Sequence, residues 1–581
     1  MIMEKQRKSK QKQLMIFLPV LIQAAALLFL LLRAPYGWCF NDEPFIISLA
    51  QRLYMGDRLI LDEWNPAQVF GPVLLPFYYV FRLFCRDNTG ILLTFRYMYC
   101  AVWWSTCLFI YHVIKKYTHS VTASLCIFIY LVLFSPLDNM TLSYTSIGLA
   151  SCLMLSCIIL KAKDLLQKNL ILFSVMLSAC ITILILCSPY MAGAYSLILM
   201  TAIWKSKKRN SSEYECLYRS VRWSGGFVFL FFVIFFLCFV RMKGEDWKSY
   251  LECIRLILSN PDHSNTNILS KLFACFAEII DKNRLFSAII GISIACSFYK
   301  KGVRQYRLVL FIICVCGYLY AEYCYLSNNI YVKFNQQMID IAILGFAAFS
   351  LLEDKPWDLF FSFTIVGLIY TFVNYLATNT GLYSIGMTLS VCGVGSIVYV
   401  VKLCLELKAQ YLKEGVLFFI FPLICAGIMV TQFSSELFTR TIRQYWDEEP
   451  AALTETIQIG AAKGLKTTSE RKDEYEQQYE ELKTLLDCVT EKEEKRFVCF
   501  TASPVIYLDA DMRFGTFTSW SFPYQDDYMD YLNKYEEITH HSGERVFYIS
   551  RQEDLPDTFP TEHYQVFSTG KSAVFVPRDT M

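Results

Sequence analysis

The sequence has few charged residues. Asp, Glu, Lys and Arg make up 18% of its 581 residues, whereas hydrophobic residues make up 55%. A soluble globule of this size needs more polar surface, so the composition excludes a purely soluble protein. Nucleic-acid binding is not favoured either. The net charge is only +2, and Lys and Arg stand in short clusters between apolar stretches rather than on one face of a folded domain.

Common metal- and phosphate-binding motifs are also missing. The 22 cysteines include no Cys-x-x-Cys pair and lie mostly inside apolar stretches, which indicates small packing residues in a membrane rather than disulfides or zinc ligands. Gly460 and Gly464 lack the spacing and the terminal Lys-Ser/Thr of a P-loop, so we interpret them as turn glycines.

Apolar stretches of about 20 residues, the length needed to cross a bilayer, recur between residues 14 and 433. The first follows a basic N-terminus and is too long for a signal-peptide core, so we expect it to stay as an anchor. We predict 13 spans, at about 14–33, 91–114, 121–135, 146–161, 170–187, 190–204, 222–241, 284–299, 308–326, 337–352, 358–377, 383–403 and 415–433.

Residues 69–85 decide the topology. They are apolar but short, and they contain two prolines and Arg82. If this segment does not cross, the Lys- and Arg-rich short loops fall on the side of the basic N-terminus, as the positive-inside rule requires; if it crosses, every assignment inverts. We therefore predict an interfacial helix on the outer side, a cytoplasmic N-terminus and an extracytoplasmic C-terminus.

The predicted fold is an all-α polytopic membrane domain, residues 1–433, with a first extracytoplasmic loop at 34–90. The tail differs in composition, and residues 434–581 are predicted to form a soluble extracytoplasmic α/β domain. Its expected elements are a helix with Ser469 as N-cap, strands at Arg496–Thr501 and Arg545–Ser550, and a hairpin around Gly570.

Adjacent carboxylates, Asp42 and Glu43, come just after the first span. Pro44 suits the first turn of a helix, in which Phe45, Leu49 and Leu53 would share one face. A carboxylate at the bilayer surface is where a general base is needed if an acceptor hydroxyl attacks a sugar whose leaving group is a membrane lipid phosphate. An ordinary acidic helix start explains the same residues without any chemistry.

A second acidic pair lies further along the same loop. Asp62 and Glu63 stand beside Trp64, a residue typical of membrane interfaces. Two acidic pairs in one outer loop, next to a short helix, indicate a shaped site rather than a linker.

The order of these features resembles a known family. One span, an Asp-Glu loop, a proline-containing apolar helix and a span with an early arginine, Arg96, are similar to the GT-C superfamily of membrane glycosyltransferases. The bacterial branch similar to protein O-mannosyltransferases and lipid A aminoarabinose transferases fits best. The sequence departs from many members in one respect: Phe70-Gly71-Pro72 stands where they carry His-Pro-Pro.

The resemblance implies transfer of a sugar from a polyprenyl-phosphate donor to an extracytoplasmic glycan, lipid or protein acceptor. It implies that Asp42 is the catalytic base and that Glu43 supports it. Asp138, in the next outer loop, would help to bind a divalent metal cation, although taken alone it reads as a turn aspartate.

Cations are needed to neutralise the lipid phosphate that leaves. Arg96, near the outer end of its span, and Lys333, in a later outer segment, are the candidates, with Asp62 and Glu63 as further substrate-binding residues. Arg96 could instead extend to the lipid headgroups. The alternative function is a transporter or flippase of lipid-linked or small polar substrates, which usually shows internal repeats and ionisable groups deep in several spans.

Overall fold

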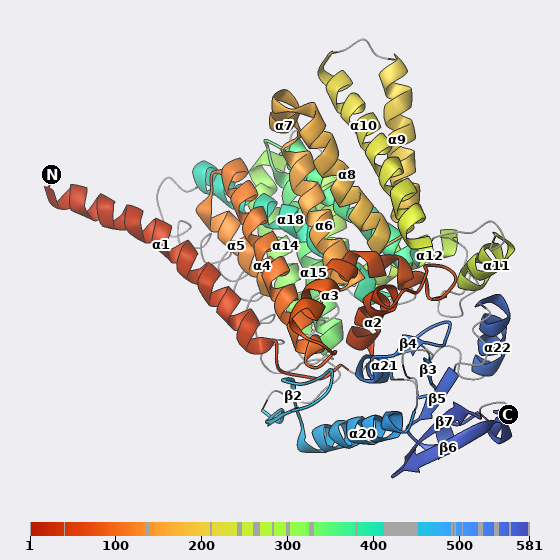
Figure 1. Ribbon diagram of the computed structural model, residues 1–581. Helices are drawn as coiled ribbons and strands as arrows, with labels where there is room; N and C mark the ends of the chain where they lie inside the picture. The colour runs from red at the N-terminus through yellow and green to blue at the C-terminus, as the bar shows by residue number, and fades with distance from the viewer. Residues whose placement is uncertain are drawn as a thin grey trace.

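The chain folds into a bundle of helices that stands above a smaller C-terminal region containing a β-sheet (Figure 1). The computed structural model describes residues 2–39, 41–133, 140–208, 212–240, 247–258, 268–281, 284–297, 303–324, 330–377, 381–411, 451–489, 492, 495–501, 503–520, 527–539, 545–556 and 559–578.

The bundle is built from consecutive helices joined by short connections. They are α1 (Ile2–Arg33), α4 (Ile91–Thr118), α5 (Val121–Leu133), α6 (Tyr144–Leu160), α7 (Ala162–Lys168), α8 (Leu170–Cys187), α9 (Met191–Lys208), α10 (Ser212–Phe235) with the π-helical turn η3 (Phe236–Val240), α11 (Trp247–Leu258), α12 (Ile268–Asp281), α13 (Arg284–Ser297), α14 (Val303–Cys324), α15 (Ile330–Leu351), α16 (Trp357–Leu359) with η6 (Phe360–Ile365), α17 (Val366–Ala377) and α18 (Leu382–Tyr411).

Seven of the described helical segments are long and apolar enough to cross a membrane, and further apolar helices are shorter. Within the described residues, each predicted apolar stretch from 14–33 to 383–403 coincides with a helix or a pair of consecutive helical segments over most of its length. The stretch 415–433 lies outside the described residues. The protein is therefore a mostly helical membrane protein, as its composition predicts.

The first loop between α1 and α4 contains α2 (Asp42–Tyr54), the 3₁₀ turn η1 (Pro66–Phe70) and α3 (Gly71–Phe84). The sequence predicts that Phe45 and Leu49 share one face of α2; in the structure both are buried, as is every other residue from Glu43 to Arg52. The helix is covered on two sides. Gly71 of α3 lies against the Leu49 carbonyl, while on another face the Ser48 hydroxyl lies 2.6 Å from that of Ser519 and the Gln51 amide donates to the Tyr507 carbonyl at 3.2 Å, both in the C-terminal region.

The C-terminal region is a mixed α/β unit, as predicted. A five-stranded sheet has the order β4-β3-β5-β7-β6, in which β3 is parallel to β4 and β5 and the last three strands are antiparallel. The hairpin turns at Gly570, which has a φ of +56°. The strands and helices are β1 (Glu455–Thr456), β2 (Lys466–Thr467), α20 (Ser469–Asp487), β3 (Arg496–Cys499), α21 (Val505–Ala510), β4 (Arg513–Phe514), α22 (Tyr528–Thr539), β5 (Arg545–Ile549), η8 (Gln552–Asp554), η9 (Thr561–His563), β6 (Tyr564–Thr569) and β7 (Ser572–Pro577).

One boundary in this region differs from the prediction. Ser469 is the first helical residue of α20 rather than its N-cap, and the Thr468 hydroxyl accepts the Arg471 N–H instead. A threonine and a serine in sequence both suit an N-cap, so the choice depends on the approach of the preceding chain.

The C-terminal region caps the start of α4. The Gly90 and Leu92 N–H groups, which have no partner within their own helix, donate to the Gly460 and Ala461 carbonyls at 3.0 and 3.2 Å. The loop that supplies these carbonyls is held by the Asp509 carboxylate, which accepts the Ala461 N–H at 2.7 Å. Gly460 and its neighbours therefore fix the membrane helices to the C-terminal region.

We expect Gly460→Ala to weaken this attachment. Gly460 has a φ of +67°, and a Cβ there would overlap the Tyr475 hydroxyl. Left-handed backbone and overpacking together cost about 2–5 kcal/mol, so the thermal midpoint followed by tryptophan fluorescence should drop by at least about 5 °C. Gly291→Ala is the control, because that helical position has no neighbour within 4 Å. Equal midpoints for the two variants would contradict the expectation.

The α3 helix contacts the C-terminal region at both ends. Before it, the Trp64 N–H donates to the Phe517 carbonyl at 2.7 Å. Near its end, the Arg82 guanidinium pairs with the Asp511 carboxylate at 2.9 Å, and the Asn88 amide donates to the Leu508 carbonyl at 2.9 Å. Together with its preceding turn, α3 is long and apolar enough to span a membrane. Both ends of this segment nevertheless contact the C-terminal region.

Candidate functional site

The acidic pair stands at the start of α2, as the sequence predicts. The two carboxylates have different surroundings: Glu43 is 1% exposed, whereas Asp42 is only partly buried. Both lie in the first turn of the helix, where the helix dipole favours the ionised form of a carboxylate.

Arg96, in the second turn of α4, binds both carboxylate oxygens of Glu43. Its Nε lies 2.9 Å and its Nη2 2.5 Å from the two Glu43 carboxylate oxygens. Its Nη1 donates to three carbonyls that follow α1, those of Ala34, Tyr36 and Gly37, at 2.9–3.2 Å. A bidentate Arg–carboxylate pair is rigid as well as strong, so Arg96 joins the end of α1, the start of α2 and α4 at one point.

The predicted phosphate contact of Arg96 stays a prediction. The side chain is 1% exposed, and these five hydrogen bonds already engage its guanidinium. A phosphate would reach it only after part of this arrangement opens. In the conformation described, Arg96 positions the segment that carries Asp42.

Burial and the negative charge of Glu43 both raise the pKa of Asp42. A carboxylate with a raised pKa is a stronger base than an ordinary aspartate, which suits proton abstraction near neutral pH. Burial, helped by the same two carboxylates, raises the pKa of the neighbouring Cys39 thiol to about 12. That thiol stays protonated and is a poor nucleophile.

The second acidic pair faces a different partner. Glu63 lies 3.1 Å from Arg52 of α2, and the Asp62 carboxylate accepts the Arg58 N–H at 2.7 Å. Arg52 also pairs with Asp57 at 2.9 Å and donates to the Asp62 carbonyl. Asp62 and Glu63 are both 3% exposed, so substrate binding by this pair, which stays a prediction, requires the surrounding interface to open.

Arg52 connects this cluster to the C-terminal region. It donates to the Thr516 carbonyl at 2.8 Å, and its guanidinium lies 4.7 Å from the centre of the Phe514 ring. Sequence analysis did not single out Arg52. Its local signal was a basic residue in the last turn of α2, with acids following in the same loop.

Two predicted residues cannot be placed. Asp138 lies outside the described residues, and of Lys333 only the backbone, within α15, is described. Within the part of the chain that is described, no group of three His, Cys, Asp or Glu side chains could hold a metal ion. The structure therefore brings together Asp42, Glu43 and Arg96 and places Asp62 and Glu63 in a separate cluster.

No protein-family model matches the chain, and no curated protein matches its sequence. Among solved structures it is similar to the archaeal oligosaccharyltransferase AglB from Archaeoglobus fulgidus, a structure in complex with an inhibitory peptide and a dolichol-phosphate. The identity is 10% and the TM-score 0.48, over 96% of this chain and 74% of that one. At these values the likeness says nothing about what this chain binds or transfers.

Proposed function

We propose that the protein is a membrane glycosyltransferase of the GT-C type, which transfers a hexosyl or pentosyl unit from a polyprenyl-phosphate donor to an extracytoplasmic acceptor. Asp42 takes the proton of the acceptor hydroxyl, whose oxygen forms the new bond to the anomeric carbon. The bond from that carbon to the phosphate oxygen breaks, and polyprenyl phosphate leaves with the electron pair. The acceptor class is a glycan, a lipid or a protein.

The observation that carries this proposal is the difference between two adjacent carboxylates. Glu43 is buried and doubly bonded to Arg96, so it holds position. Asp42 stands on the same rigid turn, is partly exposed, and has a raised pKa. A general base has to be accessible, fixed in place and tuned toward neutral pH, and Asp42 meets all three requirements.

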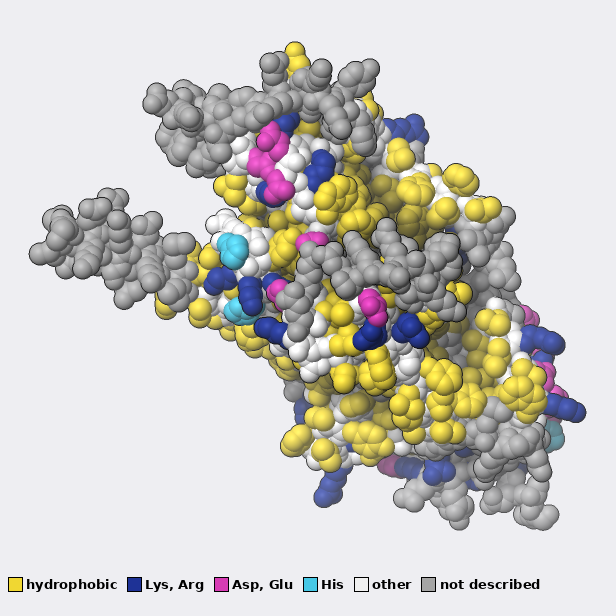
Figure 2. All heavy atoms as spheres, turned by 90° about the horizontal axis from the view of Figure 1, so that it is seen from above, with side chains coloured by type: hydrophobic (Ala, Val, Ile, Leu, Met, Phe, Trp, Pro, Cys, Tyr) yellow, Lys and Arg dark blue, Asp and Glu magenta, His cyan; other side chains and the backbone are white. Residues whose placement is uncertain are grey.

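The same geometry supports an outward-facing site. The start of α4 binds the C-terminal region, while its last turn, 28 residues on, carries Lys115 and Lys116. A helix of that length spans about 42 Å, so the two ends lie on opposite sides of a bilayer. Figure 2 shows further Lys and Arg side chains on the face opposite the C-terminal region. By the positive-inside rule that face is cytoplasmic.

Within this arrangement α3 lies along the outer surface, since both its ends contact the C-terminal region. The first extracytoplasmic loop then comprises residues 34–90, and the chain crosses 13 times, the stretch 415–433 included. Residues 434–581 form the extracytoplasmic domain.

Two native cysteines test this topology. Cys488, just after α20, and Cys216, near the start of α10, are both exposed. In right-side-out membrane vesicles a membrane-impermeant maleimide should modify Cys488 at once and Cys216 only after permeabilisation, with labelled peptides mapped by mass spectrometry. The variants Cys488→Ala and Cys216→Ala identify each signal. Immediate modification of Cys216 together with protection of Cys488 would reverse the proposed orientation.

The donor phosphate needs cationic partners in this reaction. Lys333 and a divalent metal cation held with the help of Asp138 stay predictions, and chelation by EDTA tests the second. If such a cation is required, transfer stops on chelation and returns with added Mg²⁺ or Mn²⁺.

The proposed reaction is tested in proteoliposomes that contain the purified full chain and a polyprenyl-phosphate donor with a radiolabelled sugar. Envelope extract supplies the acceptor. Formation of a labelled glycoconjugate together with free polyprenyl phosphate supports the transferase. Labelled sugar that reaches the far side without any new glycosidic bond would instead establish a transporter.

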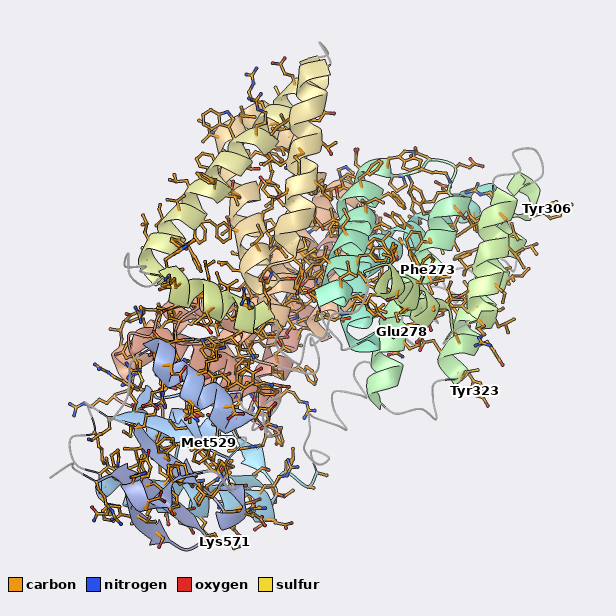
Figure 3. All side chains as sticks on the ribbon, turned by 90° about the vertical axis from the view of Figure 1, so that its right-hand side faces the viewer. Phe273, Glu278, Tyr306, Tyr323, Met529 and Lys571 are labelled. Carbon is orange, nitrogen blue, oxygen red and sulfur yellow. The ribbon has the colours of Figure 1, made fainter. Side chains whose placement is uncertain are left out.

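One observation favours that transporter alternative. Asp340 of α15 and Glu322 of α14 are 0% and 4% exposed inside the bundle. The Gln337 amide donates to the Glu322 carboxylate at 2.8 Å, and the Gln336 amide to Asp340 at 3.3 Å. Buried ionisable groups among membrane helices mark substrate or proton pathways. This cluster lies toward the Tyr323 end of α14, the end that faces the side of the C-terminal sheet (Figure 3).

A further inference from the structure

A polar cleft of about 540 Å³ lies in the C-terminal region. One wall is α20, and the other comprises the segments that follow β3 and β5, beginning at Thr501 and Ser550. The turn of the last hairpin closes one end of the cleft. Lys571, in this turn, lies at the end of the C-terminal region that is farthest from the membrane helices (Figure 3). The volume falls in the range of pockets that bind small ligands.

The topology of the sheet explains why a cleft forms there. From β3 the chain passes through α21 to β4 on one side, and from β5 it passes through η8 and η9 to β6 on the other side. The two connections leave in opposite directions, so the carboxyl ends of the adjacent parallel strands β3 and β5 remain uncovered. Open α/β sheets bind ligands at this switch point.

Fixed hydroxyl groups form the floor of the cleft. The Thr501 and Ser550 hydroxyls lie 2.8 Å apart, and each is 3.1 Å from the same oxygen of Asp554. The Ser550 N–H also donates to the Thr501 hydroxyl at 3.1 Å. These bonds hold three polar side chains at the ends of two strands, which preorganises them for further hydrogen bonds.

The charges of the cleft balance, which argues for an uncharged ligand. Arg551 is paired with Glu474 at 3.4 Å across the cleft. Glu481 accepts from Ser572 at 2.6 Å and from Gln477 at 2.8 Å. The charged lining residues are three cations and three acids: Arg471, Glu474, Glu481, Arg551, Asp554 and Lys571. A phosphate site would carry an excess of cations, whereas hydroxyl-rich ligands use donors and acceptors of both kinds.

The cleft is connected to the candidate catalytic segment through Trp38. This residue lines the cleft, and its ring lies 4.6 Å from that of Tyr475 on α20. Asp42 follows Trp38 by four positions, which corresponds to at most about 14 Å of extended chain. A ligand longer than one sugar ring could therefore occupy the cleft while its end approaches Asp42.

From these features we infer that the cleft binds a neutral oligosaccharide, the part of the acceptor that is not itself modified. The role as acceptor rests on the proposed glycosyltransferase function; the binding of saccharide does not. This inference assigns the C-terminal region a recognition function in addition to its structural contacts with the first loop.

The test measures binding rather than turnover. The full chain in lipid nanodiscs is mixed with maltotetraose, cellotetraose, mannotetraose or chitotetraose, and saturation-transfer difference NMR detects contact. At least one tetrasaccharide should give a signal. The double variant Gln478→Ala/Glu481→Ala, which removes two lining side chains of α20, should weaken that binding at least about tenfold. The matched control Glu480→Ala changes an exposed neighbour on the same helix that does not line the cleft, and its affinity should stay at the wild-type value.

Three outcomes overturn the inference: no signal from any of the four sugars, a signal that survives in the double variant, or displacement of the sugar by inorganic phosphate. Asp42→Asn should leave saccharide binding unchanged. Binding without transfer would therefore contradict only the proposed enzyme, whereas transfer without binding in the cleft would contradict only this inference.

Discussion

Asp42→Asn is expected to lower the rate of sugar transfer by about 10²- to 10⁴-fold, the range that general-base catalysis contributes. The amide keeps the size of the side chain but cannot accept the acceptor's proton. In the wild type the rate should fall at acid pH as Asp42 becomes protonated, with an apparent pKa above the usual value of an aspartate, because burial and Glu43 raise it. This acid limb should be absent from the residual activity of Asp42→Asn.

Glu43→Gln separates the base from the residue that positions it. Glu43 raises the pKa of Asp42, so its neutralisation should move the acid limb of the pH–rate profile to lower pH while leaving the limb present. The loss of the ion pair with Arg96 should also lower the rate. Asp487→Asn, which changes an exposed aspartate that pairs with Lys492 on the surface, serves as the control. Unchanged transfer by Asp42→Asn would contradict the assignment of the base.

Arg52→Met is expected to have the largest effect on stability. Methionine matches the apolar volume of the side chain but leaves Glu63 buried without its cation and leaves Asp57 with Arg496 at 3.7 Å as its remaining cation. The removal of one partner from a buried ion pair costs about 3–5 kcal/mol. Hydrogen exchange should therefore become about 10²- to 10³-fold faster in segments 57–65 and 513–519, which Arg52 and the Trp64 N–H join.

The pH dependence of this defect has a definite sign. Burial already raises the pKa of Asp57 and of Glu63, and the charge of Arg52 opposes that rise. Without Arg52 both folded-state pKa values rise further. Below these pKa values the two buried acids are protonated and neutral, so they destabilise the fold little. As the pH rises through the pKa values the acids become charged and stability is lost. The defect should therefore be larger at pH 8 than at pH 5.

Arg58→Met provides the comparison for Arg52→Met. The Arg58 side chain is 24% exposed and pairs with Asp62 at 3.4 Å, while the Asp62 carboxylate also accepts the backbone N–H of residue 58 at 2.7 Å, which the variant keeps, so its loss should cost less than the loss of Arg52. The triple variant Arg52→Met/Asp57→Asn/Glu63→Gln should recover part of the lost protection, because it removes the uncompensated charges. Equal exchange rates in the Arg52 and Arg58 variants would contradict the proposed role of the buried cluster.

The start of the helix that carries the candidate site was predicted from sequence because its signal is local. Pro44 and the acids before it mark the start of a helix, and α2 begins at Asp42. The apolar spacing placed Phe45 and Leu49 on one face of α2, and both are buried, but the burial of the remaining residues from Glu43 to Arg52 depends on partners that the sequence of the helix does not indicate. Arg96 was singled out for its position in a span, but its partner Glu43 lies 53 residues away along the chain.

By itself, the sequence determined the apolar membrane helices, the separate α/β composition of the tail and the acidic start of α2. These follow from composition, periodicity and turn residues, which act over a few neighbouring positions. The tertiary structure alone decided which carboxylate is accessible, which arginine holds each acidic pair and which strand ends leave a cleft open. Such choices depend on packing between segments far apart in sequence, because a buried charge is stable only where the fold brings its partner within hydrogen-bonding distance.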